Sequence, residues 1–195
     1  MAEIAGLVLA AGGGRRYGMP KALVAYEGKL LVERAAETLR RADVTLSVVV
    51  LGASAPEVLA RATGLPATVI NPDWASGLGS SLRVGLEALR GTSATATVVL
   101  LVDMPAVTPE AVRRVTALAT HDALVMGGYD DRRGHPVLLG RAHWAGVAES
   151  ATGDRGARDY LRAHAGLVRV VPVGDVAADF DLDHPPQPTK HGSVD

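Results

Sequence analysis

The stretch LVLAAGGGRRYGMPK, residues Leu7–Lys21, decides the fold. An uninterrupted apolar run ends in three consecutive glycines, and basic residues follow. Such a run, too short for a buried helix and closed by a glycine turn, is typical of the first strand of a parallel α/β sheet. The backbone N–H groups of a glycine turn bind phosphate well, especially with cations at its exit. The stretch therefore predicts phosphate chemistry at the carboxyl end of the first strand.

Strand and helix patterns alternate along the rest of the chain. Further strands are expected at 46–51, 67–70, 97–102 and 123–126, then at 135–139 and 167–173. The first five strands, including 4–10, show little polar alternation, which is typical of strands covered on both faces. Helical patterns lie at 31–39, 82–89, 112–119, 141–148 and 157–165, and Thr108 and Pro109 provide a start signal for the third. We expect a three-layer α/β/α fold whose mostly parallel sheet carries an antiparallel strand in its second half.

Length and composition favour one domain. The chain has 195 residues, of which 48% are apolar, and we expect residues 1–183 to form a single domain with a Pro-rich, disordered tail over 184–195. A net charge of −1 argues against nucleic-acid binding, and no cysteine is present for disulfides or thiolate sites. No apolar run reaches ~18 residues, and no secretory signal opens the chain. A cytoplasmic protein without membrane contact is the expectation.

The glycine loop fits neither of two common nucleotide motifs. A dinucleotide fingerprint needs a third glycine where Tyr17 stands. A P-loop needs Lys directly after its second glycine and a hydroxyl next, whereas Lys21 is delayed and Ala22 follows it. Arg15 and Lys21 nevertheless suit phosphate oxygens, Arg15 by forked contacts and Lys21 as a point charge. A plain strand-to-helix turn is the alternative.

Two further motifs carry candidate site residues. Asp103 emerges where the apolar run VVLLV ends, and a fixed carboxylate at that edge is a typical magnesium ligand. The alternative interpretation is that Asp103 helps to cap the next helix, but Thr108 is better placed for that role. In NPDWASGLGSSL, Gly77, Ser80 and Ser81 open a helix and offer contacts to a base or sugar.

The stretches RRGHPVLL and TGDRGARDYL indicate a second binding region. We expect His135, Asp154 and Arg158 to face a second, anionic substrate, although ordinary surface loops are an alternative interpretation.

Taken in order, LAAGGGRRYGMPK, NPDWASGLGSSL, DMP, GHPVL and GDRGAR resemble the MobA-like nucleotidyltransferases over residues 4–183, and most of all the molybdenum-cofactor cytidylyltransferase branch. The resemblance implies a Rossmann-like nucleotidyltransferase fold and a loop from 10 to 21 that holds a nucleoside triphosphate. Nucleotide-binding residues carried over by it are Leu9, Ala10, Ala11, Gly12, Gly13, Lys21, Gly77, Ser80 and Ser81. It also implies that His135, Asp154 and Arg158 face a phosphate-bearing pterin.

The resemblance further implies a base and a metal. Guanylyl-transferring relatives tend to have Leu-Ala-Gly-Gly where this chain has Leu-Ala-Ala-Gly, which favours CTP. Mg²⁺ would bind Asp103 together with a carboxylate of the stretch DFDLDHPPQ. That stretch departs from the family's usual Asp-Ile-Asp-Thr-Pro-Glu-Asp ending, and Asp181 is favoured over Asp179 and Asp183.

The resulting hypothesis is an enzyme that transfers CMP from CTP to the phosphate of molybdopterin and releases pyrophosphate. Lys21, Arg15 and Asp103 are its expected catalytic residues, and a molybdoenzyme or its chaperone is a possible transient partner. Alternatives are transfer to another phosphate acceptor, with GTP or a sugar or polyol phosphate, and a non-catalytic role in cofactor delivery. A dehydrogenase is disfavoured because Gly52-Ala53-Ser54 follows the second strand, where an acid for the ribose belongs.

Overall fold

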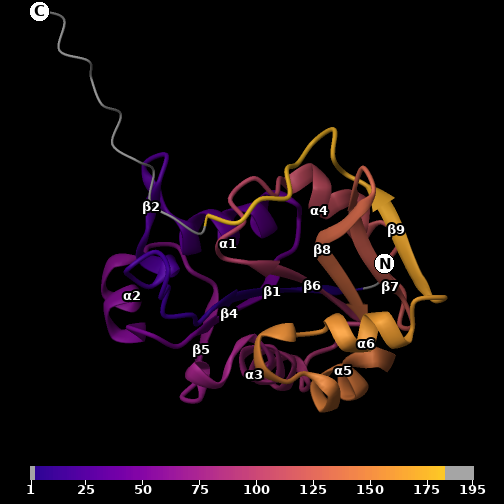
Figure 1. The fold of residues 1–195 in the computed structure, drawn as a ribbon, viewed down its shortest axis with the longest axis horizontal. Coiled ribbons are helices and arrows are strands. Elements are labelled where there is room, and N and C mark those ends of the chain that lie inside the picture. The colour runs from indigo at the N-terminus through magenta and orange to yellow at the C-terminus, as the bar shows by residue number, and fades with distance from the viewer. Residues whose placement is uncertain (1–2, 183–195) are drawn as a thin grey trace, which may run out of the picture.

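A seven-stranded sheet forms the centre of the protein (Figure 1). The structure, a computed structural model, describes residues 3–182. In spatial order the strands are β5 (Ala67–Ile70), β4 (Leu46–Leu51), β1 (Ile4–Ala10), β6 (Ala96–Leu101), β8 (Arg132–Gly140), β7 (Leu124–Tyr129) and β9 (Val168–Pro172). Only β8 runs against its neighbours β6 and β7. The predicted α/β fold with one antiparallel strand is confirmed, and a short hairpin of β2 (Ala25–Tyr26) and β3 (Lys29–Leu30) lies apart.

Helices cover both faces of the sheet (Figure 1). One face carries α1 (Leu31–Arg41), α2 (Ala55–Arg61) and α4 (Pro109–Thr116), and the other carries α3 (Leu78–Leu89), α5 (Trp144–Ser150) and α6 (Arg158–Ala163). Along β1, Val8 and Ala10 pack in the first core cluster, whereas Leu7 and Leu9 pack in the second. Because successive side chains point to opposite faces, both kinds of position must be apolar.

Local signals in the sequence explain where the helices begin. Thr108 Oγ1 accepts a hydrogen bond from the Ala111 amide at 3.2 Å, and Pro109 is the first residue of α4, as predicted. Gly85 lets α3 approach the sheet, because a Cβ there would lie 2.5 Å from Leu7 Cδ1. The predicted helix at 141–148 instead opens with a 3-10 turn over Arg141–His143 before α5.

The sheet edges differ from the expectation of buried strands. β5 ends the sheet and is largely exposed, with Ile70 at 52%. It pairs only with β4, so half of its backbone faces away from the sheet. The prediction that 67–70 is covered on both faces is therefore wrong.

The carboxyl ends of the central strands meet at one edge. Leu9 of β1 pairs with Leu101 of β6, and Ala10 pairs with Leu51 of β4. The loops that follow these strands therefore emerge side by side, as ligand sites in open α/β sheets require. The predicted tail over 184–195 lies outside the described residues. Among residues 3–182 no helix is both long and apolar enough to cross a bilayer.

Candidate active site

The glycine loop closes on itself after β1. Gly14 has a φ of +61°, and a Cβ there would lie 1.8 Å from the carbonyl oxygen of Met19. The Gly18 amide donates to the Gly14 carbonyl at 2.8 Å. Only glycine accommodates both the left-handed backbone and this close approach. The closed loop carries Lys21 back toward the sheet, into a 3-10 turn over Lys21–Leu23.

Lys21 meets Asp103 at the carboxyl edge. Lys21 Nζ lies 2.8 Å from Asp103 Oδ2, and the side chains are 13% and 22% exposed. The Val102 amide donates to the Leu9 carbonyl at 3.1 Å, which holds the start of this loop on β1. Residues 82 positions apart thus form one part-buried ion pair. Their predicted contacts with phosphate and Mg²⁺ stay predictions.

A cavity of about 570 Å³, here the glycine-loop cavity, opens above this pair. It is lined by Leu9, Ala11, Gly12, Gly13, Gly14, Arg15, Arg16, Lys21, Trp74, Ala75, Ser76, Gly77, Leu78, Ser81, Leu101, Val102, Asp103 and Asp154. The predicted nucleotide-binding residues are therefore gathered here, with the exception of Ala10 and Ser80.

Ser80 and Ala10 lie behind the cavity wall. Ser80 is 4% exposed, accepts a hydrogen bond from Asn71 Nδ2 at 2.8 Å and lies 2.9 Å from both the Asp73 and Gly77 carbonyls. The Ala10 side chain is buried in the core. Ser80 therefore braces the turn before α3, and a nucleotide contact for either residue stays a prediction.

Gly77 joins the turn before α3 to the loop that carries Asp154. It has a φ of +113°, and a Cβ there would lie 2.5 Å from the Gly153 carbonyl carbon and 2.8 Å from Asp154 Oδ1. Because these two loops touch, Asp154, which lies between α5 and α6, also lines the glycine-loop cavity.

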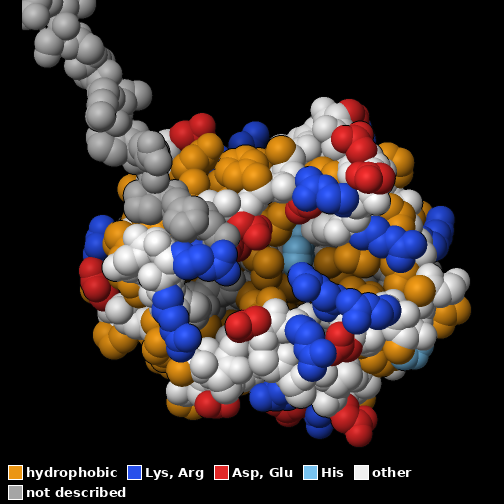
Figure 2. All heavy atoms as spheres, in the orientation of Figure 1, with side chains coloured by type: hydrophobic (Ala, Val, Ile, Leu, Met, Phe, Trp, Pro, Cys, Tyr) orange, Lys and Arg blue, Asp and Glu red, His pale blue; other side chains and the backbone are white. Residues whose placement is uncertain are grey.

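A second cavity of about 540 Å³, the arginine cavity, adjoins the first. The two share Leu9, Leu78, Leu101 and Asp154 in their walls. Its floor is apolar and includes Leu82, Val99, Met104, Met126, Val137, Leu139 and Leu161, whereas Arg133, Arg155, Arg158 and Arg162 lie in its walls. Figure 2 shows basic side chains gathered around a hollow in this face of the molecule.

His135 lines the arginine cavity at the beginning of β8. Because β8 is antiparallel to β6, its first residues lie at the carboxyl edge of the sheet. Burial lowers the pKa of His135 to about 4; the charges of Asp103 and Asp179 oppose this shift, and Arg158 adds to it. At neutral pH the imidazole is therefore uncharged. Tyr129 Oη donates to the His135 carbonyl at 2.5 Å, and burial with the charge of Asp179 raises the pKa of Tyr129 to about 12.

The segment 173–182, here the C-terminal strap, crosses the top of the site. The Leu182 amide donates to the Asp103 carbonyl at 2.8 Å, and Asp179 and Asp181 line the arginine cavity. A Cβ on Gly134 would lie 2.8 Å from Asp179 Oδ1, so any side chain at this position would displace the Asp179 carboxylate. Asp183 lies outside the described residues.

Residues 6–168 match the family model described as the MobA-like NTP transferase domain. The chain belongs to this family of nucleotidyltransferases. The resemblance carried by the sequence motifs is thereby confirmed, and the glycine-loop cavity of this MobA-like transferase lies where the family model covers the chain.

Solved structures similar to this chain share its fold, and one sequence relative is named for an oxidoreductase activity. A relative from Paenarthrobacter nicotinovorans, named nicotine blue oxidoreductase, is 37% identical over 189 residues and 92% of each chain. The crystal structure of an Rv0371c homologue from Mycobacterium sp. strain JC1 has a TM-score of 0.78 at 31% identity, over 93% of this chain and 91% of that one. Rv0371c of Mycobacterium tuberculosis in complex with manganese has a TM-score of 0.75 at 28% identity, over 88% and 89%.

The acidic residues of this MobA-like transferase suit a hard divalent cation. Asp103 and Asp181 offer carboxylate oxygens, and the Leu182–Asp103 hydrogen bond brings their segments together. Residues 3–182 contain no group of three His, Cys, Asp or Glu side chains placed for a metal. A pair of carboxylates fits Mg²⁺, which keeps several waters and takes its other ligands from substrate phosphates.

Three site residues were not singled out from the sequence or were set aside. Arg133 stands beside the quoted Gly-His-Pro motif, Trp74 stands inside NPDWASGLGSSL, and Asp179 was weighed below Asp181. All three line a cavity. The only signal for them in the sequence was their position next to or within a motif, because a single arginine or tryptophan forms no recognisable pattern.

Proposed function

We propose that this MobA-like transferase moves CMP from CTP to the phosphate of molybdopterin, with Mg²⁺, and releases pyrophosphate. The observation that carries the proposal is the pair of adjoining cavities. One is built from the glycine loop and basic side chains, and the other has an apolar floor beneath arginines. Such a pair suits a triphosphate on one side and an anionic heterocycle on the other.

In the proposed reaction, a phosphate oxygen of the acceptor attacks the α-phosphorus of CTP in line. A new P–O bond forms, and the bond from the α-phosphorus to the bridging oxygen breaks. The electron pair leaves with pyrophosphate. Because a phosphate monoester has a second pKa near ~6, the nucleophile is already ionised at neutral pH and needs no general base. Burial lowers the pKa of His135 to about 4, so its imidazole is a weak base and is given no proton transfer in this step.

The residues around the phosphates supply charge and position. Lys21 would balance the developing charge of the leaving pyrophosphate, and Arg15 would make forked contacts from the loop. Asp103 and Asp181 would hold Mg²⁺, which when bound neutralises charge on the triphosphate. Neutral His135 and Arg158 would orient the acceptor.

The CTP preference is supported by Ala11, whose side chain lines the glycine-loop cavity where the family's guanylyl-transferring branch tends to have glycine. We also infer a cytoplasmic location and delivery of the product to a molybdoenzyme or its chaperone, in keeping with a cofactor intermediate.

The test is pyrophosphate release from CTP with molybdopterin and Mg²⁺. Wild-type protein should release pyrophosphate at a rate at least tenfold higher with CTP than with GTP. Asp103→Asn should lower kcat by roughly 10²–10³, the loss typical for removal of one charge-stabilising group at a reacting centre. Glu87→Gln, which changes a carboxylate in an exposed pair with Arg90, is the matched control. Equal rates with GTP would refute the CTP assignment, and full activity of Asp103→Asn would refute the metal assignment.

A second candidate function is that of an oxidoreductase. The relative named nicotine blue oxidoreductase, 37% identical over 92% of this chain, favours it. Against it, Tyr17 stands at the third fingerprint glycine, and Gly52-Ala53-Ser54, with no acidic residue, directly follows β4. Oxidation of NADH or NADPH by this chain with nicotine blue, at a rate that exceeds CTP turnover with molybdopterin, would establish it in place of the transferase.

A further inference from the structure

Trp74 lies across the ends of two neighbouring strands. It opens the 3-10 turn Trp74–Ser76 between β5 and α3. A Cβ on Gly13 would lie 2.9 Å from Cζ3 of the indole, and a Cβ on Gly52 would lie 2.6 Å from the Trp74 Cβ. The side chain therefore covers the glycine loop after β1 and the turn after β4. Because neither glycine has a side chain, Trp74 can pack closely against both turns.

The indole is half-buried in the wall of the glycine-loop cavity and keeps its donor unused. Within residues 3–182, Trp74 Nε1 donates no hydrogen bond. The other tryptophan of the chain, Trp144, is 6% exposed and donates from Nε1 to the Leu139 carbonyl at 2.9 Å. Tryptophan N–H groups that leave water usually find a partner, so the two indoles differ in what they are placed to contact.

Trp74 and the Lys21–Asp103 pair lie at different places in the wall of the glycine-loop cavity. In the sheet order β5-β4-β1-β6, Trp74 covers β4 and β1, whereas Asp103 follows β6. Neighbouring strands are about 4.8 Å apart, which separates the indole from the Lys21–Asp103 pair by roughly 7–10 Å. A nucleotide whose phosphates contact Lys21 can therefore reach the indole with its base.

We propose that Trp74 is the aromatic wall of the nucleobase subsite, where its ring contacts the base and its free N–H donates to a base or ribose oxygen. The inference rests on the proposed function to the extent that the ligand is a nucleoside triphosphate. Contact of a base with an aromatic side chain is typically worth roughly tenfold or more in affinity. The contact depends on the base and not on the phosphates.

Two single-tryptophan variants test the placement. In Trp144→Phe, where Trp74 is the only indole, CTP with Mg²⁺ should change the emission of the protein, and the change should saturate with CTP. In Trp74→Phe, where Trp144 is the only indole, most of this change should disappear. The measurement needs no acceptor. Saturable binding without CMP transfer would therefore refute the proposed function and leave the Trp74 assignment intact.

Affinity measurements separate a base contact from a general disturbance of the loop. Trp74→Ala should weaken CTP binding roughly tenfold, whereas inorganic tripolyphosphate, which has no base, should bind as in the wild type. Trp74→Phe keeps an aromatic ring and should retain most of the CTP affinity, and it carries the test if Trp74→Ala does not fold. Equal weakening of CTP and tripolyphosphate, an emission change that persists in Trp74→Phe, or CMP transfer with unchanged CTP affinity in Trp74→Ala would each overturn the inference.

Discussion

The Leu182 amide donates a hydrogen bond to the Asp103 carbonyl at 2.8 Å, which ties the C-terminal strap to the loop after β6. Asp181 immediately precedes this bond. The strap starts at the edge strand β9, four positions from β1 in the sheet order. Its path over the site therefore brings the backbone next to Asp181 into contact with the backbone of Asp103.

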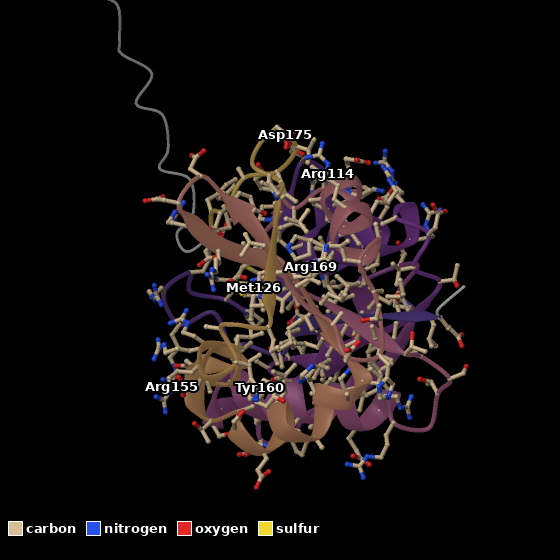
Figure 3. The ribbon with its side chains drawn as sticks, turned by 90° about the vertical axis from the view of Figure 1, so that its right-hand side faces the viewer. Arg114, Met126, Arg155, Tyr160, Arg169 and Asp175 are labelled. Carbon is tan, nitrogen blue, oxygen red and sulfur yellow. The ribbon has the colours of Figure 1, made fainter. Side chains whose placement is uncertain are left out.

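Arg114 anchors the strap far from the proposed metal. It forms two hydrogen bonds with the Asp175 carboxylate, at 2.6 and 2.9 Å, and Figure 3 shows the two residues next to each other. Arg114→Ala should release the strap near Asp175 and raise the Mg²⁺ concentration at half-maximal activity, by roughly twofold to fivefold, because exposed ion pairs contribute little each. Arg113→Ala, which removes a neighbouring arginine paired with Glu110, is the control. An equal Mg²⁺ requirement in all three proteins would show that the anchor does not position Asp181.

The central strands could be predicted because their chemistry is local. β1, β4 and β6 are short apolar runs, and the cap at Thr108 needs only neighbouring residues. The exposure of β5 could not be predicted, since a short apolar run such as ATVI is compatible with both a central and an edge strand. Sheet order is set by non-local pairing.

The part of the site that depends on local motifs was also predicted. Lys21 and Asp103 belong to motifs, and each follows a predicted strand, so their meeting follows from parallel strand ends. Arg133 reaches the site because β8 is antiparallel and begins at the carboxyl edge. The sequence predicted an antiparallel strand in this half of the chain but did not identify β8 as that strand. Ser80 looked available for a ligand, but its hydroxyl is engaged by Asn71 and two carbonyls.

Alanine substitutions at two glycines of the loop distinguish the cost of a left-handed backbone from the cost of a steric clash. Gly14 and Gly18 both have positive φ, but only a Cβ on Gly14 meets another atom, the Met19 carbonyl oxygen at 1.8 Å. Both alanine substitutions should cost about 1–2 kcal/mol for the left-handed conformation. Gly14→Ala must also open the loop, so it should lose more CTP affinity than Gly18→Ala. Urea unfolding and CTP titration measure the two effects, and equal CTP affinities would show that the loop opens freely.

Glu33 links the start of α1 to the end of α2. Its carboxylate accepts hydrogen bonds from the amide of Leu30 at 2.9 Å and from the amide and hydroxyl of Thr63 at 2.7 and 3.0 Å. Burial alone raises the pKa of Glu33, but these hydrogen bonds and the charge of Lys29 outweigh it and lower the pKa below its ordinary 4.5. The stabilisation is therefore complete above the unfolded-state pKa and is lost as the pH falls through the lower folded-state pKa.

Glu33→Gln should accordingly reduce the free energy of unfolding by about 1 kcal/mol at pH 7, as expected for loss of a helix-start contact. The difference from wild type should shrink below about pH 4.5, where Glu33 becomes protonated. Urea unfolding at several pH values measures it. Glu57→Gln, in an exposed pair with Arg61, should show little change at any pH. A difference that is constant with pH would show that the charge of Glu33 is not involved.

Arg133 should determine how tightly the acceptor binds. It lines the arginine cavity, and within residues 3–182 it makes no ion pair or side-chain hydrogen bond, so its guanidinium is available to an anion. Arg133→Ala should raise the KM for the phosphate-bearing acceptor about tenfold, the typical loss for a charge-assisted hydrogen bond, and leave the KM for CTP unchanged. Arg169→Ala, on the exposed edge strand β9 (Figure 3), is the matched control because its side chain lines neither cavity. If the KM for CTP rises instead, the arginine cavity holds the nucleotide, and the two cavities exchange their proposed roles.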